Sequence, residues 1–174
     1  MAAETENNEK QENSNFDSDS WEPRILGFLC RWCSYAGADL AGTSRLHYPA
    51  NIRIIRVPCS GRVDPLFILK AFQTGGVDGV LVAGCHPGEC HYTEGNYYTR
   101  RRLTVLGKLL EYIGIHPKRF RLEWVSASEG PKFAKLVDEM RADLKTVGPY
   151  QTPATWFGGK VVNKGVENGR REVA

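Results

Sequence analysis

Cysteines follow each of the first three strand-like segments of this chain, and this placement limits the folds that can use them together. The segments at residues 25–29, 52–57 and 80–83 are rich in Ile, Leu and Val, as β-strands are. The thiols that come after them are Cys30, Cys33, Cys59, Cys85 and Cys90. Because the carboxyl ends of parallel strands meet at one edge of a sheet, we expect these thiols to converge there.

Helix-like segments alternate with the strands. Asp64 followed by Pro65 is a strong helix start, and apolar residues then recur at helical spacing until Gly75. A short helix is expected after Cys33 and two longer ones later, with a fourth strand at 120–125 between the longer two. This order predicts a single α/β domain with a mainly parallel, flavodoxin- or Rossmann-like sheet of about four strands, flanked by helices.

The two ends of the chain differ in composition from its middle. Residues 1–20 contain six acidic residues and one lysine, a net charge of −5 within a chain whose net charge is +3. They offer almost nothing apolar to bury, so we expect a disordered acidic leader there. We expect the α/β domain at 21–149 and an extended tail at 150–174, in which Trp156 and Phe157 are the only strong apolar anchor.

Composition predicts a soluble protein in a reducing environment. The hydrophobic fraction of 41% is typical of globular proteins, and no apolar run reaches the roughly 18 residues of a membrane span. The first 20 residues also lack the apolar stretch of a secretory signal. We therefore expect a cytoplasmic protein without membrane contact, in which cysteines serve as ligands or redox thiols instead of disulfides.

The residues alone leave three uses of the cysteines open. The spacing of Cys30 and Cys33 fits a thiol-redox pair or half of a metal site, and the spacing of Cys85 and Cys90 occurs in plant-type [2Fe–2S] proteins. A structural adaptor with zinc on four thiolates is the third possibility. Two histidines flank the last cysteine pair, and we expect them to hydrogen-bond or stack near the surface instead of binding metal: His86 and His91.

The sequence contains no motif for stand-alone catalysis. It has no phosphate-binding loop, no G-x-G-x-x-G, no paired-carboxylate motif and no recognisable Ser-His-Asp arrangement. Basic residues cluster at 100–102 and 118–121, which favours an acidic partner. Because no nucleic-acid recognition motif accompanies this charge, we expect protein partners and no nucleic acid.

The sequence around the cysteines resembles the delta subunit family of methyl-viologen-reducing (F420-non-reducing) hydrogenases of methanogenic archaea and some anaerobic bacteria. The match is carried by residues 28–39 (FLCRWCSYAGAD), 53–65 (RIIRVPCSGRVDP), 78–92 (DGVLVAGCHPGECHY) and 94–97 (EGNY). It extends from residue 25 to about 148, so nothing in it applies to the leader or the tail.

The resemblance implies a [2Fe–2S] cluster held by four of the five cysteines. Such subunits carry electrons from the small and large subunits of a nickel–iron hydrogenase, or from a formate dehydrogenase, to the flavin subunit of heterodisulfide reductase. A cluster on Cys30, Cys33, Cys85 and Cys90 would use both closely spaced pairs. Cys59 would replace one of these ligands if its strand lies between the other two.

Other residues near the cysteines would then adjust the cluster and its contacts. Glycines would let backbone amides approach the sulfurs: Gly61, Gly84 and Gly88. Arginines would raise the reduction potential, unless they pair with acids such as Asp39 and Asp64: Arg31, Arg56 and Arg62. Aromatic residues at the same edge would form an interface: Trp32, Tyr35, Tyr92, Tyr97 and Tyr98.

Overall fold

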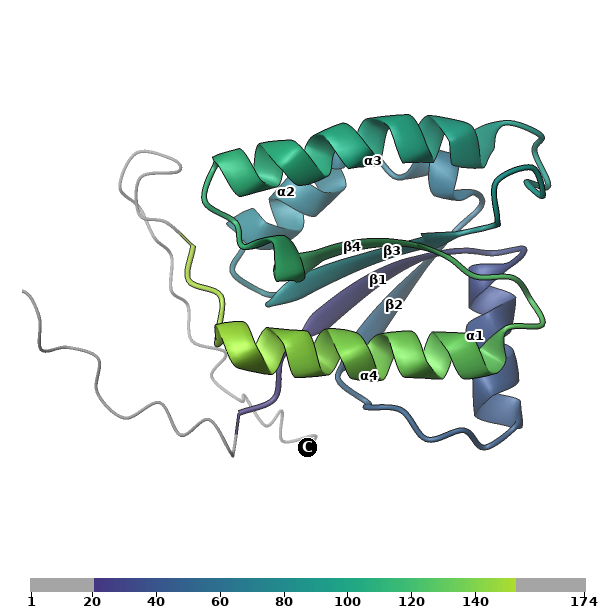
Figure 1. Cartoon of the computed structure of the whole chain (residues 1–174), viewed down its shortest axis with the longest axis horizontal. Helices are drawn as coiled ribbons and strands as arrows, with labels where there is room; N and C mark the ends of the chain where they lie inside the picture. The colour runs from purple at the N-terminus through teal and green to yellow at the C-terminus, as the bar shows by residue number, and fades with distance from the viewer. Residues whose placement is uncertain (1–20, 153–174) are drawn as a thin grey trace, which may run out of the picture.

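The computed structural model describes residues 21–152, which form one four-stranded parallel sheet with helices on both faces (Figure 1). The strands are β1 (Ile25–Cys30), β2 (Ile52–Val57), β3 (Gly79–Gly84) and β4 (Phe120–Trp124). Their spatial order is β2-β1-β3-β4, and every pairing is parallel. The predicted α/β domain with a flanked, parallel sheet of four strands is confirmed.

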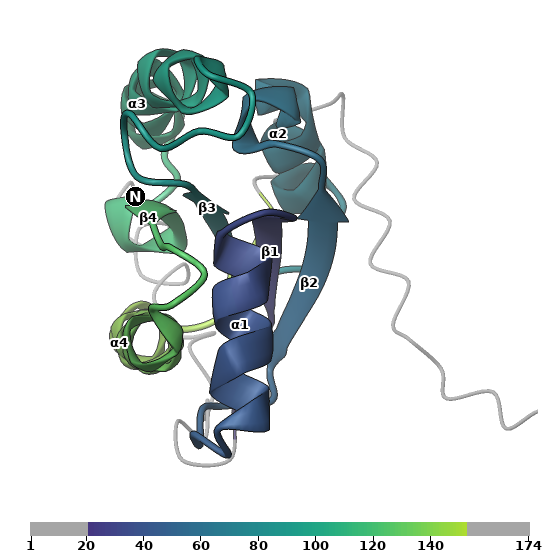
Figure 2. The same cartoon turned by 90° about the vertical axis from the view of Figure 1, so that its right-hand side faces the viewer.

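Two helices cover each face of the sheet (Figure 2). Helices α1 (Ser34–Thr43) and α4 (Gly130–Val147) pack together on one face, and α2 (Pro65–Gln73) and α3 (Gly95–Tyr112) cover the other. Short 3₁₀ turns precede α2 and β4: η1 (Ser60–Arg62) and η2 (Pro117–Arg119). No helix within residues 21–152 combines the length and the apolar character needed to cross a membrane.

The sequence accounts for these elements locally. Every residue of β3 is buried, as expected for a central parallel strand covered on both faces. The Asp64 carboxylate caps α2 by accepting a hydrogen bond of 2.8 Å from the Leu66 amide, and Pro65 occupies the first helical position. Helix α3 turns one stripe toward the sheet, made of Asn96, Thr99, Leu103, Leu106 and Leu110.

The strand before Cys59 does not lie between the other two cysteine-bearing strands, so the condition under which the sequence favoured Cys59 as a ligand is not met. Strand β1 is the central one: Cys30 aligns with Val57 of β2, and Leu29 aligns with Ala83 of β3. The chain crosses one face through α1 to reach β2, then returns across the other face through α2 to reach β3. This reversal creates a topological switch point between β1 and β3, where open α/β sheets bind ligands.

The opposite edge of the sheet is closed by a buried polar network. The Asp78 side chain is buried and accepts hydrogen bonds from the backbone amides of Arg24 and Tyr150, at 2.8 and 2.9 Å. Arg119 donates to the Asp78 carbonyl at 3.0 Å, and the Tyr150 ring packs 5.2 Å from that of Phe72. Packed structure thus continues past residue 149, while the predicted leader and most of the predicted tail lie outside the described residues.

Candidate metal centre

All five cysteines lie at the carboxyl edge of the sheet, as the strand pattern predicts. Cys30 Sγ lies 3.7 Å from Cys85 Sγ, and Cys59 Sγ lies 3.8 Å from Cys90 Sγ. Cys33 contacts Cys85 as well, and all five thiols are free. Each of these two close pairs joins cysteines from different loops, so the fold and not the local sequence brings them together.

The backbone explains this pairing. Cys30 ends β1 and Cys85 follows β3, so the two thiols flank the switch point between neighbouring strands. Cys59 follows β2 and opens the η1 turn. The loop after Cys85 reverses at Gly88, whose φ of +91° favours glycine, and it ends at Cys90 beside Cys59. Thiols from β2 and from the β3 loop therefore meet although β1 lies between these strands.

The sulfur separations match those of two thiolates on one tetrahedral metal ion. With metal–sulfur bonds of about 2.3 Å, the tetrahedral angle places two thiolates about 3.8 Å apart. The observed values of 3.7 and 3.8 Å agree with this separation for both pairs. Among residues 21–152, no group of three or more His, Cys, Asp or Glu side chains is arranged to hold a single metal ion. Four of the five thiols form two close pairs, which suits a cluster of two metal ions, and Cys33 lies beside Cys85 of the first pair.

The thiols differ in acidity. Contact with Cys85, together with the backbone amides of Trp32, Cys33 and Ser60, lowers the pKa of Cys30 to about 6. The same contact raises the pKa of Cys85, since only one of the two thiols ionises readily. Burial raises the pKa of Cys59 to about 11. Metal binding at neutral pH would therefore release protons from most of these thiols.

The start of α3 lies against the second thiol pair, which is Cys59 and Cys90; the first pair is Cys30 and Cys85. A Cβ atom added at Gly95 would lie 2.3 Å from Cys59 Sγ and 3.2 Å from Cys90 Sγ. One added at Gly61 would lie 2.8 Å from the Gly95 carbonyl, and the Gly61 amide donates to Cys59 Sγ at 3.3 Å. The prediction that the Gly61 backbone approaches a sulfur is confirmed. The sequence does not single out Gly95, because only the fold shows that the first residue of α3 faces the thiols.

Two buried polar side chains fix the first thiol pair. Ser34 Oγ accepts a hydrogen bond from the Cys30 amide at 2.8 Å and donates to the Ala83 carbonyl at 2.7 Å, which ties β1 to β3 beside the thiols. Asn96 donates to the carbonyls of Cys85 and His86 at 3.2 and 2.6 Å. Neither residue type signals such a role in the sequence, since Ser and Asn at helix starts usually cap the helix.

The part of the chain that carries the thiols matches a known family. The sequence model of the family described as "Methyl-viologen-reducing hydrogenase, delta subunit" matches residues 25–148, which include all five cysteines. The chain belongs to this family.

Similar proteins extend the comparison. The chain is 52% identical, over 134 residues, to an F420-non-reducing hydrogenase iron-sulfur subunit of Archaeoglobus profundus, and the match covers 77% of this chain and 97% of that one. A vhc-type F420-non-reducing hydrogenase iron-sulfur subunit of Methanococcus voltae is 52% identical over 132 residues, or 76% of this chain and 91% of the relative. The chain is also 46% identical over 152 residues to a subunit of the ferredoxin:CoB-CoM heterodisulfide reductase of Methanosarcina mazei, covering 87% of this chain but 18% of that protein.

The two histidines of this delta-family chain contact side chains other than the cysteines and hold the loop from Cys85 to Cys90 in place. His86 Nε2 lies 2.7 Å from a carboxylate oxygen of Glu129, which also accepts a hydrogen bond of 2.7 Å from the Ser126 amide. These two contacts, the amide first, lower the pKa of Glu129 to about 2. His91 stacks on Trp32 with ring centroids 3.7 Å apart. The expectation that both histidines hydrogen-bond or stack is confirmed.

Two arginines of the site lie over aromatic rings. Arg31 lies 5.6 Å from the centre of the Trp32 ring, and Arg56 lies 5.1 Å from that of Tyr35. The alternative that these arginines pair with acids is not seen for Arg31, Arg56 or Arg62 among residues 21–152.

The predicted aromatic edge is largely present. Trp32, Tyr92, Tyr97 and Tyr98 are exposed, whereas Tyr35 is half-buried against the core under α1 and α4. Tyr35 is therefore less available for an interface than the other four, because it packs in part against the core cluster beneath α1.

Proposed function

We propose that this chain is an iron–sulfur electron-transfer subunit that carries a [2Fe–2S] cluster at the carboxyl edge of its sheet. The observation that supports this most directly is the pair of sulfur separations, 3.7 and 3.8 Å, each suited to one tetrahedral iron. The names of the relatives agree, since the similar proteins of Archaeoglobus profundus and Methanococcus voltae are called iron-sulfur subunits. The bound cluster would supply reversible one-electron chemistry.

Four of the five cysteines suffice for such a cluster. In our proposal Cys30 and Cys85 hold one iron, and Cys59 and Cys90 hold the other, because the sulfurs of these pairs lie 3.7 and 3.8 Å apart. Cys33 is then the fifth thiol. It lies next to Cys85 and is more accessible than Cys30, Cys59 or Cys85.

The chain's own groups would set the reduction potential. Backbone amides of Trp32, Cys33 and Ser60 point to Cys30 Sγ, and the Gly61 amide points to Cys59 Sγ. Hydrogen bonds to ligand sulfurs stabilise the more negative, reduced form and raise the potential. The positive charges of Arg56 and Arg62, which form no ion pair among residues 21–152, would act in the same direction.

We further propose that the electrons come from a nickel–iron hydrogenase or a formate dehydrogenase and pass to the flavin subunit of heterodisulfide reductase. Two kinds of relative support this: separate hydrogenase subunits, and heterodisulfide reductase proteins that contain a similar segment. A segment found both separate and within a reductase protein is expected to work next to that protein. Within this proposal the cytoplasm is the location and the chain has no catalytic turnover of its own.

The thiol site has an accessible side that suits electron exit. A hollow of about 370 Å³ reaches Cys59 and is lined mainly by apolar groups. Its other lining residues are Pro58, Gly61, Arg62, Tyr92, Gly95 and Tyr98. A partner seated there would approach the second thiol pair without intervening backbone layers.

Anaerobic purification followed by visible absorption tests the proposal. We expect visible absorption that bleaches with dithionite, two irons and two sulfides per chain, and a paramagnetic signal after reduction. A colourless protein with stoichiometric zinc would instead indicate a structural adaptor. A colourless, metal-free protein with a titratable dithiol would indicate a thiol-redox protein, and either result would overturn the proposal.

A further inference from the structure

Helix α3 carries a second apolar stripe on the side away from the sheet. Tyr98, Val105 and Tyr112 are seven residues apart, and Leu109 lies beside them at helical spacing. Their exposed fractions are 50%, 70%, 88% and 46%, although all four are large apolar or aromatic residues. Helix α3 forms the outer layer of the domain in both views of the fold (Figures 1 and 2), so no other described element covers this stripe.

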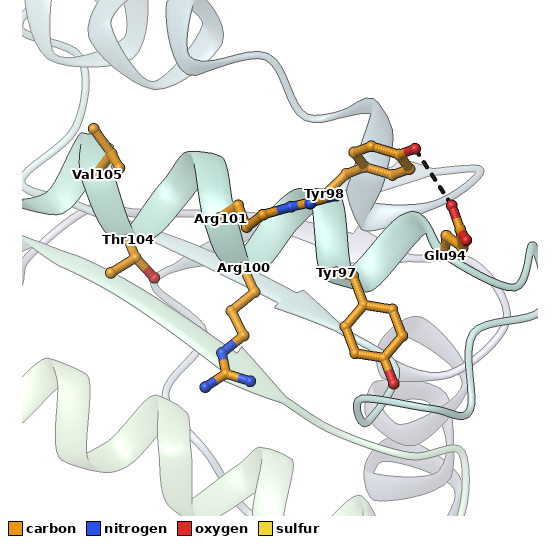
Figure 3. Close-up of a pocket in the computed structure, with 7 residues that line it drawn as sticks. All are labelled: Glu94, Tyr97, Tyr98, Arg100, Arg101, Thr104 and Val105. Carbon is orange, nitrogen blue, oxygen red and sulfur yellow. Dashed lines mark hydrogen bonds between the residues drawn. The ribbon is translucent and has the colours of Figure 1, made fainter.

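Basic residues accompany the stripe. A hollow of about 810 Å³ lies along the first half of α3. In Figure 3, Arg101 lies beside the Tyr98 ring, and Arg100 lies on the other side of the helix with Tyr97. Arg101 lies 4.9 Å from the centre of the Tyr98 ring. Among residues 21–152, neither Arg100 nor Arg101 takes part in an ion pair. Glu94 is the one acidic residue lining the hollow.

We propose that this face of α3 binds an acidic, amphipathic helix of a partner protein. The apolar stripe repeats every seven residues, which is the pattern with which one helix packs along another. The charge of the face favours an acidic partner, because Arg101 beside the stripe and Arg100 at the flank of the hollow form no ion pair among residues 21–152. A nucleic acid would neutralise the arginines but would leave the apolar stripe uncovered.

The acidic leader of the same chain is a less suitable occupant. Residues 1–20 carry the required negative charge, but Phe16 is their only aromatic residue, and they contain no Leu, Ile or Val. Glu22, just after the leader, is held at α4 by Arg141 and Lys145, on the other face of the sheet from α3. A helix of another protein matches both the charge and the apolar stripe.

The proposed docking rests on the proposed function, since it assigns a face of the domain to one member of the electron-transfer complex. This face differs from the carboxyl edge, although the two meet at Tyr98, which lines both hollows. The first turn of α3 also contains Gly95, whose backbone lies against Cys59 Sγ. A helix docked on α3 would therefore place its own protein close to the thiol site.

Two measurements on the full chain test the docking. The affinity-tagged chain is produced in its own host, purified anaerobically with its complex, and compared with the isolated chain by hydroxyl-radical footprinting. We expect protection of Tyr98, Val105 and Tyr112 in the complex, with Leu66 and Phe67 on α2 as exposed reference positions in the same samples. The second measurement uses R100E/R101E, with K70E/K135E as a control that changes the net charge equally on α2 and α4.

The expected result is about tenfold or greater weakening of one identified partner's association in R100E/R101E, with a flatter salt dependence than in the control. Equal association of the two variants would overturn the docking, as would unprotected α3 residues in the complex or a chain that purifies alone. Greater labelling of Tyr98 and Tyr112 after deletion of residues 2–20 in the isolated chain would identify the leader as the occupant and also overturn it. The visible spectrum of each variant reports the cluster separately, so the docking and the electron-transfer proposal fail independently.

Discussion

Replacing Gly95 with alanine is the sharpest test of how the second thiol pair is built. The added methyl would lie 2.3 Å from Cys59 Sγ, whereas ordinary contacts at such positions are 3.4–4 Å. The sulfur would have to move by about 1.1 Å or more to reach even the short end of that range. Metal–sulfur bonds tolerate deviations of about 0.2 Å, so Cys59 could not keep its place as a ligand.

The same helix supplies a matched control. A Cβ atom at Gly107 would meet the Phe120 ring at 3.7 Å, an ordinary contact. Alanine in the interior of a helix is favoured over glycine by up to about 1 kcal/mol, so G107A should keep the cluster and raise the melting temperature. Without metal, the Cys59 side chain of G95A can rotate away, so we expect the metal-free fold to survive.

The assay is iron and sulfide content after anaerobic reconstitution, together with the paramagnetic signal of the reduced protein. We expect G95A to lose most of its cluster or to show a shifted signal, with native near-ultraviolet circular dichroism in the metal-free form. G107A should match the wild type in iron content and signal. Full iron content and an unchanged signal in G95A would refute the assignment of Cys59 as a ligand.

Three further perturbations have outcomes that follow from contacts in the structure. C85A and C90A should each abolish the cluster whereas C33A keeps it, which iron content and the reduced-state signal decide; loss of the cluster in C33A would exclude our ligand set. The pKa of Glu129 is lowered from 4.5 to about 2. Its contacts therefore stabilise the fold above pH 4.5, and this stabilisation is lost as the pH falls toward 2. The melting temperature of metal-free E129Q should therefore lie below that of the wild type at pH 7 and converge with it in acid; a pH-independent gap would contradict this. Truncation after Pro149 should destabilise the fold by about 1–3 kcal/mol, because the buried Asp78 carboxylate loses the Tyr150 amide, whereas truncation after Thr152 should not; equal denaturant midpoints would refute this.

The sequence is sufficient to predict the helices and strands and the convergence of the thiols at one edge of the sheet. Apolar runs and the Asp64–Pro65 start are local signals, and cysteines after parallel strands must share an edge. The pairing of the thiols could not be predicted, because it depends on β1 lying in the centre and on the loop from Cys85 folding back at Gly88. Spacing alone favours Cys30 with Cys33, whereas the fold brings Cys30 to Cys85.

The supporting residues are hidden from sequence analysis for the same reason. Gly95, Ser34 and Asn96 act through backbone groups that are distant along the chain, and each has an ordinary local explanation as a helix-start residue. The exposed outer stripe of α3 could not be predicted from the sequence either. The inner stripe follows the helical period, and only the packed structure shows that the sheet covers Leu103 and Leu106 while Val105 and Tyr112 remain exposed.

Helix α3 links the thiol site to the proposed partner. Its first residue lies against Cys59 Sγ, and Tyr98 follows about 4.5 Å further along the axis at 1.5 Å per residue. By the same rise, Tyr112 lies about 26 Å from Gly95, so only the first turns of the stripe are near the thiols. The part of the stripe far from the thiols would add binding area, and the part near them would align the partner with the thiol site. Because one rigid helix carries both, a partner that binds along the whole stripe is held at a fixed position relative to Cys59 and Cys90.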